Sequence, residues 1–255
     1  MARTQPVPPD PPDPDIQAKA LEIHRRLCPE YGCPIAYFQD LDPLEELVSS
    51  FLNHRTRNRD AKAAYRALRA RFGSWEDVIA AAPEDVEDAI RSVRWPEMKA
   101  PRLQAILRGI RDRHGSFDLS FLGGLPVREA RAWLEALPGV GPKTSAAVLS
   151  FSALRRAALP VDSHHHRVAQ RTGLIPATMD VGPAHAALEA LVPGDWDAQA
   201  VYDHHEVFML HGQKVCHWRS PACGRCVLLD LCPTGLAREA RQGRDGPQRA
   251  HHRSA

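Results

Sequence analysis

Four cysteines near the carboxyl-terminal end form the densest group of side chains that could do chemistry. They follow the spacing C-x6-C-x2-C-x5-C and are Cys216, Cys223, Cys226 and Cys232. Four thiolates so close together in a cytoplasmic chain favour a metal site over disulfides. Thiolates suit either a [4Fe–4S] cluster or structural zinc, and the spacing alone does not decide between them. The remaining cysteines, Cys28 and Cys33, are expected to be plain thiols.

A lysine follows a loop of glycine and proline in the stretch LEALPGVGPKTSAAVLS, residues 134–150. The chain has 33 Lys and Arg residues, and five of them are lysines: Lys19, Lys62, Lys99, Lys143 and Lys214. An amine can lose its proton and attack a carbon atom, whereas a guanidinium cannot. Lys143 is therefore a candidate nucleophile, although codon usage is the simpler explanation for any single lysine.

The same stretch is predicted to form two helices joined by a hairpin. Residues 131–137 are helical, and residues 138–141 make a tight turn that needs glycine's conformational freedom. Pro142 suits the first position of the next helix. The N–H groups of the turn and the positive end of that helix would together bind one backbone phosphate. The spacing excludes a P-loop, and a purely structural turn is the alternative.

The rest of the chain shows helical periodicity. Asp42, Pro43 and Glu45 combine a cap, a first-turn proline and a capping-box acid, and apolar residues follow at helical spacing. Another apolar face ends before Gly115. No run alternates like a strand for more than a few residues. The predicted fold class is all-α.

Composition limits the possible functions. A chain of 255 residues with 44% apolar and 25% charged residues is typical of a soluble protein with one large or two modest domains. No apolar run approaches a membrane span and no signal peptide is evident, so we expect a cytoplasmic protein. A net charge of +2 is too small to indicate by itself that the protein binds a polyanion. A Pro/Asp-rich tail at 1–15 and a basic tail at 236–255 are predicted to be disordered.

Three motifs occur in order: LPGVGPKT, PVDSHHHRV, and HHEVFMLHGQKVC leading into the cysteines. Together they resemble the endonuclease III family of base-excision DNA glycosylases, over roughly residues 20 to 233. The resemblance favours a [4Fe–4S] cluster over zinc. It implies two helical domains with the active site in a cleft between them. These are a six-helix barrel at 45–157 and a cluster domain from both chain ends, at 16–44 and 158–235.

The resemblance also implies roles for individual residues. Lys143 falls on the family's nucleophilic lysine and Asp162 on its catalytic aspartate. As a damaged base departs, C1′ gains positive charge, which a carboxylate stabilises while the amine attacks. The resulting imine permits β-elimination of the 3′ phosphate. The residues of the helix-hairpin-helix implied to bind DNA are Leu137, Gly139, Gly141 and Thr144.

Six histidines are interpreted as structural or DNA-facing and not as metal ligands. Three of them, in the motif that opens a helix after Asp162, are His164, His165 and His166. Three others, expected to pack around the cluster helix, are His204, His205 and His211.

Two loops depart from the family pattern. His54 stands where the family has a glutamine that fills the gap left by the flipped nucleotide. Trp95, beside Arg94, stands where the family wedges an aliphatic residue into the opposite strand. Ordinary core packing is the alternative for Trp95. In the family the cysteine loop approaches DNA phosphates, a role that falls here on Arg219 and Arg225.

These features predict a bifunctional DNA glycosylase and abasic-site lyase for oxidised pyrimidines. One alternative is a relative that removes other damaged or mispaired bases. Another is a DNA-binding paralogue with little or no catalytic activity. The expected partner is double-stranded DNA with damaged bases or abasic sites, bound by a monomer that associates with the nucleoid through DNA and with no membrane.

Overall fold

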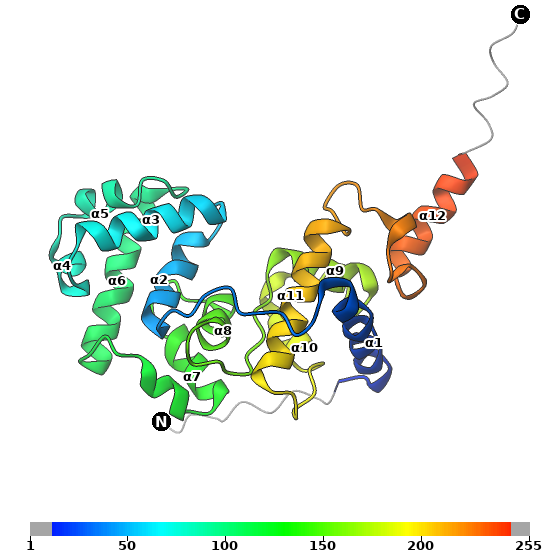
Figure 1. Ribbon diagram of the computed structural model, residues 1–255, viewed down its shortest axis with the longest axis horizontal. Helices are drawn as coiled ribbons and strands as arrows, with labels where there is room; N and C mark the ends of the chain where they lie inside the picture. Colours follow the sequence, from blue (N-terminus) through cyan, green and yellow to red (C-terminus); the bar gives the residue numbers. More distant parts are fainter. Residues whose placement is uncertain (1–11, 246–255) are drawn as a thin grey trace, which may run out of the picture. The chain divides into compact units, whose positions relative to one another are not determined.

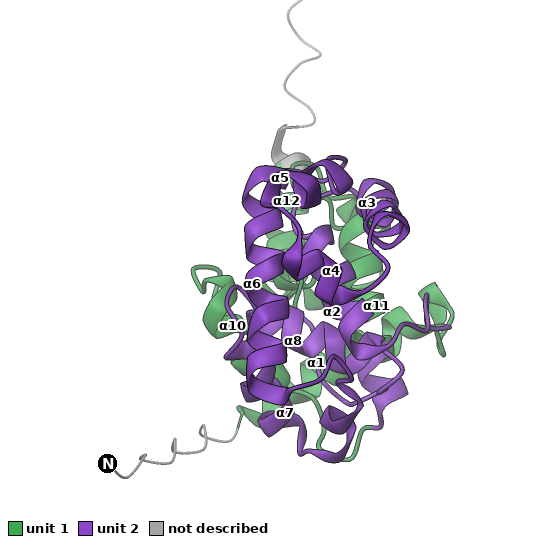
Figure 2. Ribbon diagram, turned by 90° about the vertical axis from the view of Figure 1, so that its left-hand side faces the viewer, with its two compact units in different colours: residues 1–35, 161–196, 203–255 green, residues 36–160, 197–202 purple. Residues whose placement is uncertain are grey.

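The structure is a computed structural model that describes residues 12–245. The chain folds into two compact units (Figure 2). The first unit comprises the residues up to Ile35, Val161–Trp196 and the residues from Asp203 onward, whereas the second comprises Ala36–Pro160 and Asp197–Tyr202. The first unit is therefore built from both ends of the chain and the second from its middle.

Helices are the only regular elements of the described residues, which contain no strand (Figure 1). The predicted all-α class is confirmed. Within residues 12–245, no helix combines the length and the hydropathy needed to cross a membrane. The predicted cleft between two domains stays a prediction.

The second unit carries most of the large aliphatic core. Its helices are α2 (Pro43–Asn53), α3 (Asn58–Arg71), α4 (Trp75–Ala80), α5 (Pro83–Ala89), α6 (Pro96–His114), the 3-10 helix η1 (Ser120–Gly124), α7 (Val127–Glu135) and α8 (Pro142–Phe151). As predicted, the Asp42 side chain caps α2 by accepting a hydrogen bond from the N–H of Glu45 at 2.8 Å. The predicted end of α6 is also confirmed, because Gly115 follows it in the left-handed region. One cluster of buried apolar side chains runs from Leu44 to Ala158 and joins these helices.

The predicted helix-hairpin-helix is formed by α7 and α8. Gly139 has a φ of 80°, a left-handed conformation that glycine adopts without strain. Gly141 is the N-cap of α8, and its carbonyl accepts hydrogen bonds from the N–H groups of Thr144 and Ser145 at 2.9 and 3.0 Å. Pro142 takes the first helical position, where its missing N–H costs no hydrogen bond. The glycines and the proline that predicted this motif in the sequence therefore adopt the conformations expected of them.

The first unit contains shorter helices and irregular segments. Its elements are α1 (Pro14–Tyr31), α9 (Ser163–Thr172), α10 (Val181–Glu189), the larger part of α11 (Ala198–Lys214), the 3-10 helices η2 (Cys223–Arg225) and η3 (Leu229–Leu231), and α12 (Pro233–Asp245). The segment that carries the four cysteines, residues 216–232, is called the cysteine loop and follows directly after α11. Helix α12 contacts η2 and η3 of this loop, and also α9.

Parts of both predicted tails are helical. Asp13 caps α1 by accepting a hydrogen bond from the N–H of Asp15 at 2.9 Å, so a Pro/Asp sequence read as disordered contains a helix start. At the other end α12 continues to Asp245, because its first turn packs against the cysteine loop. Residues 1–11 and 246–255 lie outside the described residues.

The prediction that Cys28 and Cys33 are plain thiols was wrong. Their sulfur atoms form a disulfide, with Cα atoms 5.0 Å apart. The reason is the end of α1, where Gly32 adopts a left-handed φ of 81° and turns the chain back. The N–H of Cys33 then donates to the carbonyl of Cys28 at 3.0 Å, which brings the two side chains together.

Candidate active site

Lys143 occupies the second position of α8, directly behind the hairpin. Its side chain is half-buried, whereas Pro138 and Gly139 at the tip of the hairpin are exposed. The first turn of a helix presents N–H groups that have no partner within the helix, and the helix dipole places positive charge there. An anion bound at the hairpin would thus lie next to a lysine amine.

Hydrogen bonds to Glu135 connect the two helices of the hairpin. The Ser145 hydroxyl donates to Oε1 of Glu135 at 2.6 Å, and Nε of Arg131 donates to the same oxygen at 3.3 Å. Leu137 is a core residue, and its carbonyl accepts the N–H of Val140 at 3.2 Å. The Leu137 side chain therefore packs inside the unit and is not available to DNA.

A buried carboxylate lies near Lys143, and sequence reasoning missed it. Glu46 on α2 is 1% exposed, and its Oε1 accepts the Ser50 hydroxyl at 2.7 Å while Oε2 accepts the amide of Gln39. Burial raises the pKa of Glu46, although these hydrogen bonds and the positive charge of Lys143 act to lower it. The sequence gives no signal for its burial, because the helical period places Glu46 opposite the apolar face of Leu44, Leu47 and Phe51.

Asp162 is the N-cap of α9, as the motif predicted. Its Oδ1 accepts the N–H groups of His164 and His165 at 2.9 and 2.7 Å. One oxygen therefore makes both capping bonds, and Oδ2 makes neither. Nearby, burial raises the pKa of Glu206 to about 7, with smaller contributions from Asp162 and Asp203.

The start of α9 is held against α11 at close range. Gly212 lies so near His164 that a Cβ at this glycine would stand 2.7 Å from the His164 Cβ. The guanidinium of Arg167 donates to the carbonyl of Gly212 at 2.8 Å and to that of Cys216 at 3.0 Å. These contacts connect the orientation of Asp162 to the first cysteine of the loop.

The histidines pack with one another and with aromatic rings. His165 is buried and stacks on Phe208 with ring centroids 4.4 Å apart, and His204 lies 4.6 Å from the same ring. His166 instead contacts the carbonyl of Met179 through Nε2 at 2.9 Å. His211 contacts the Cys226 sulfur at 3.5 Å. These positions agree with the structural interpretation of the motif.

All four predicted cysteines line one pocket with an empty volume of about 400 Å³. Polar hydrogens point at the sulfur atoms: the Arg171 guanidinium reaches Cys216 at 3.3 Å, and the N–H of Gly235 reaches Cys232 at 3.3 Å. No three His, Cys, Asp or Glu side chains within residues 12–245 converge on a single ion position. Four thiols around one pocket are donors of the kind that hold an iron–sulfur group.

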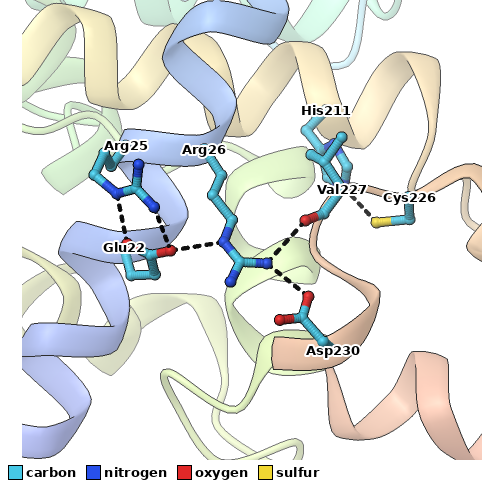
Figure 3. A network of polar contacts seen from close by, with 7 residues as sticks. All are labelled: Glu22, Arg25, Arg26, His211, Cys226, Val227 and Asp230. Atoms are coloured by element: carbon cyan, nitrogen blue, oxygen red, sulfur yellow. Dashed lines mark hydrogen bonds and ion pairs between the residues drawn. The ribbon is translucent and has the colours of Figure 1, made fainter.

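Helix α1 secures the cysteine loop from outside (Figure 3). The Arg26 guanidinium donates to the carbonyl of Val227 at 3.2 Å and to Oδ1 of Asp230 at 2.6 Å. Glu22 accepts from both Arg25 and Arg26 at 2.7 Å, which orients the second arginine (Figure 3). These hydrogen bonds attach the residues that follow Cys226 to α1.

The predicted phosphate contacts lie on the exposed side of this loop. Arg219 and Trp218 are exposed, and the main-chain carbonyl of Trp218 is held by Arg171 at 2.7 Å. Arg225 is also exposed and donates to the carbonyl of Lys214 at 2.8 Å. Sequence analysis did not identify Arg171 as a site residue. The position of an arginine in the last turn of a helix does not indicate which carbonyls it contacts in the fold.

The two loops that depart from the family pattern both belong to the second unit. His54 is exposed at the end of α2, where burial and positive neighbours that include Lys143 lower its pKa. Trp95, which precedes α6, is 38% exposed, and the Arg94 guanidinium lies 4.2 Å from the centre of its ring. Trp95 is therefore a surface residue at a helix start and not an ordinary core tryptophan.

An all-α fold with a helix-hairpin-helix in one unit and a pocket lined by four cysteines in the other defines the class of helix-hairpin-helix proteins. Residues 48–193 match the family model described as HhH-GPD superfamily base excision DNA repair protein. The chain belongs to this superfamily and, within it, to the endonuclease III family of DNA glycosylases.

Individual relatives agree with this assignment. Endonuclease III of Escherichia coli strain K12 is 30% identical over 216 residues, which cover 85% of this chain and 95% of that protein. A relative from Arabidopsis thaliana is 32% identical over 197 residues, and the chain spans 65% of its length. The prediction that the protein is a DNA glycosylase is confirmed.

Solved structures show the same fold. An endonuclease III in a non-covalent complex with DNA is similar with a TM-score of 0.74 at 24% identity, over 88% of this chain and 98% of that one. A thermostable thymine-DNA glycosylase is similar with a TM-score of 0.67 at 23% identity, over 86% and 98%.

Proposed function

We propose that this DNA glycosylase is also an abasic-site lyase, with Lys143 as nucleophile and Asp162 as the catalytic carboxylate. The observation that carries the proposal is the place of Lys143, half-buried at the start of α8 behind an exposed hairpin. A phosphate held by the hairpin would bring a neighbouring C1′ within reach of the amine. Attack by the amine forms a C1′–N bond as the bond to the base breaks, and opening of the C1′–O4′ bond then gives an imine. Loss of a proton from C2′ of this imine drives β-elimination of the 3′ phosphate.

The amine must lose its proton before it attacks. The free lysine pKa is about 10.4, so a base must take this proton at neutral pH. Asp162 keeps Oδ2 outside its capping bonds, so this oxygen can stabilise the positive charge that develops at C1′. Glu46 is a second carboxylate whose burial favours its own protonated form, and therefore its acceptance of a proton from Lys143.

We assign the four cysteines to a [4Fe–4S] cluster, because they surround one pocket and N–H groups point at their sulfur atoms. When bound, the cluster would hold the loop between Cys216 and Cys232 in a fixed shape. That shape would present Arg219 and Arg225 to DNA phosphates. Metal analysis of anaerobically purified protein should find iron and no stoichiometric zinc.

The preferred lesion is proposed to be an oxidised pyrimidine in duplex DNA, processed by a monomer. His54 and Trp95 would occupy the gap that a flipped nucleotide leaves, since both are exposed on neighbouring loops. Stacking on an aromatic ring restores roughly 1–3 kcal/mol of the lost base stacking. A panel of duplexes with one defined lesion each separates this substrate from mispaired or alkylated purines.

Borohydride trapping on abasic duplex DNA tests the catalytic assignment. The wild-type protein should form a covalent complex, and Lys143→Gln should not. Lys62→Gln is the matched control, because this lysine is exposed on α3. A trap that survives in Lys143→Gln would identify another amine as the nucleophile. A wild-type protein that forms no trap and processes no lesion would be the non-catalytic paralogue.

A further inference from the structure

Lys99 is a buried lysine for which the proposed chemistry has no use. It lies in the second turn of α6 and is 6% exposed. Its ammonium donates three hydrogen bonds: to the carbonyl of Leu52 at 2.7 Å, to the carbonyl of His54 at 2.9 Å and to the Thr56 hydroxyl at 3.0 Å. All three acceptors lie at the end of α2 or in the loop that follows it.

The same network reaches the loop that carries Trp95. The Thr56 hydroxyl accepts the N–H of Arg94 at 3.2 Å, and the N–H of Lys99 donates to the carbonyl of Trp95 at 3.0 Å. Lys99 therefore contacts one loop through its side chain and the other through its backbone. Thr56 closes the connection between them.

Both loops contain a residue in a conformation that side chains disfavour. Arg55 has a φ of 54° and Trp95 a φ of 59°, and both lie in the left-handed region. Such conformations persist only where surrounding contacts enforce them, and they concentrate at functional sites. Here the enforcing contacts are those of Lys99 and Thr56, on either side of the strained residues.

A protonated lysine matches this position despite the cost of its burial. Burial of a charged group is costly, and it lowers the pKa of Lys99 to about 8. The ammonium supplies three donors from one atom, a number that matches the three acceptors, and a cation suits the negative end of α2. Arginine carries its donors in a wide planar fork, and the neutral amine has only two N–H groups.

We propose that Lys99 is a positioning residue that locks the His54 loop and the Trp95 loop into one arrangement for entry into duplex DNA. The inference rests on the proposed role of these loops. Lys99 would not touch the reacting atoms. Its loss should therefore impair steps that need a duplex to be opened, and it should spare imine chemistry at an abasic site already in single-stranded DNA.

Two variants test the proposal. Lys99→Met keeps an unbranched side chain and removes all donors, whereas Thr56→Val removes one of the three acceptors together with the hydrogen bond to Arg94. Cleavage of an abasic duplex should fall about tenfold to a hundredfold in Lys99→Met and less in Thr56→Val, because small misplacements have large effects on reactivity. Trapping on single-stranded abasic DNA should stay within about threefold of wild type by the same reasoning. Lys99→Arg should restore part of the duplex rate.

Binding gives a second readout that needs no catalysis. A duplex that contains a tetrahydrofuran abasic analogue should bind Lys99→Met more weakly than wild type, while the single-stranded analogue binds both alike. Equal losses on both substrates with a large fall in melting temperature, or unchanged duplex binding, would overturn the role of Lys99. Absence of any trap in the wild type would instead overturn the proposed lyase activity. Lys62→Met on the surface of α3 serves as the control.

Discussion

Two buried polar side chains, one from each unit, are held in opposite ways. In the second unit Gln104 donates to the carbonyls of Val78 and Ala81 at 2.9 and 2.8 Å, and Lys99 likewise has three acceptors. In the first unit, neither ring nitrogen of the buried His165 has a hydrogen-bond partner among the described residues. Its environment consists of other rings, and Phe208 is stacked upon it.

This difference indicates what each polar group does. The hydrogen-bonded groups of the second unit connect helices and loops, so their removal leaves buried acceptors unsatisfied. The rings of His165 and His204 in the first unit instead fill space among other rings. Burial, followed by the charges of neighbouring histidines, lowers the pKa of His165 well below its usual value, and burial lowers that of His204 to about 3. These rings stay neutral at physiological pH.

The first unit is also held by close packing at one helix crossing, and a single methyl group there should have the largest effect. In Gly212→Ala the new Cβ would lie 2.7 Å from the His164 Cβ and 3.2 Å from the His164 carbonyl oxygen. Because the contact includes backbone, we expect a loss of about 3 kcal/mol. The start of α9 would move with Asp162, so the trapping rate on abasic DNA should fall about a hundredfold.

Gly182→Ala is the matched control, because a Cβ at this α10 glycine meets nothing within 4 Å. It should leave the trapping rate unchanged and raise stability by up to about 0.5 kcal/mol. Calorimetry and borohydride trapping of both variants test this packing. A Gly212→Ala protein with wild-type stability and trapping would show that the crossing tolerates displacement.

Local signals predicted much of this architecture. Asp42 with Pro43 identified the start of α2, and glycine and proline identified the hairpin, because caps and turns depend on a few adjacent residues. The cysteines were found from their spacing alone. Gly32 made the Cys28–Cys33 disulfide possible, but neither its left-handed conformation nor that pairing could be read from the spacing of two cysteines.

Tertiary partners could not be predicted in the same way. Glu46 and Lys99 look like surface residues in the sequence, because charged side chains are rarely fully buried. Only the arrangement of α2 with α8, and of α6 with the end of α2, places them inside. His165 similarly looks like part of a polar triplet, whereas the helical period turns it inward and leaves His164 and His166 only partly buried.

An intermediate effect is expected from the buried acid of the first unit. The pKa of Glu206 is raised to about 7, chiefly by burial and then by Asp162 and Asp203. Between pH 4.5 and 7 the folded state therefore binds more protons at this residue than the unfolded state does. Stability is lost as the pH rises through that range. Glu206→Gln should abolish the loss and be about 2–3 kcal/mol more stable than wild type at pH 8.

Melting temperatures from pH 4.5 to 8 measure this effect, with the exposed Glu30→Gln on α1 as control. The difference between Glu206→Gln and wild type should grow to pH 7 and then level off. The difference for Glu30→Gln should stay small throughout. A Glu206→Gln protein that is less stable than wild type at every pH would mean that the carboxylate makes a favourable charged contact in the fold.

The smallest changes in stability are expected when leucine replaces one buried polar side chain in each unit. The two substitutions compare His165 of the first unit with Gln104 of the second. His165→Leu replaces a buried ring that has no hydrogen-bond partner within residues 12–245 by an apolar side chain of similar volume, so stability should rise by about 1–2 kcal/mol. Gln104→Leu leaves the carbonyls of Val78 and Ala81 without their donor, so stability should fall by about 1–3 kcal/mol. Denaturant unfolding of both variants at pH 7 measures the two signs. Losses of similar size in both would mean that His165 is hydrogen-bonded as fully as Gln104, and the contrast between the units would be lost.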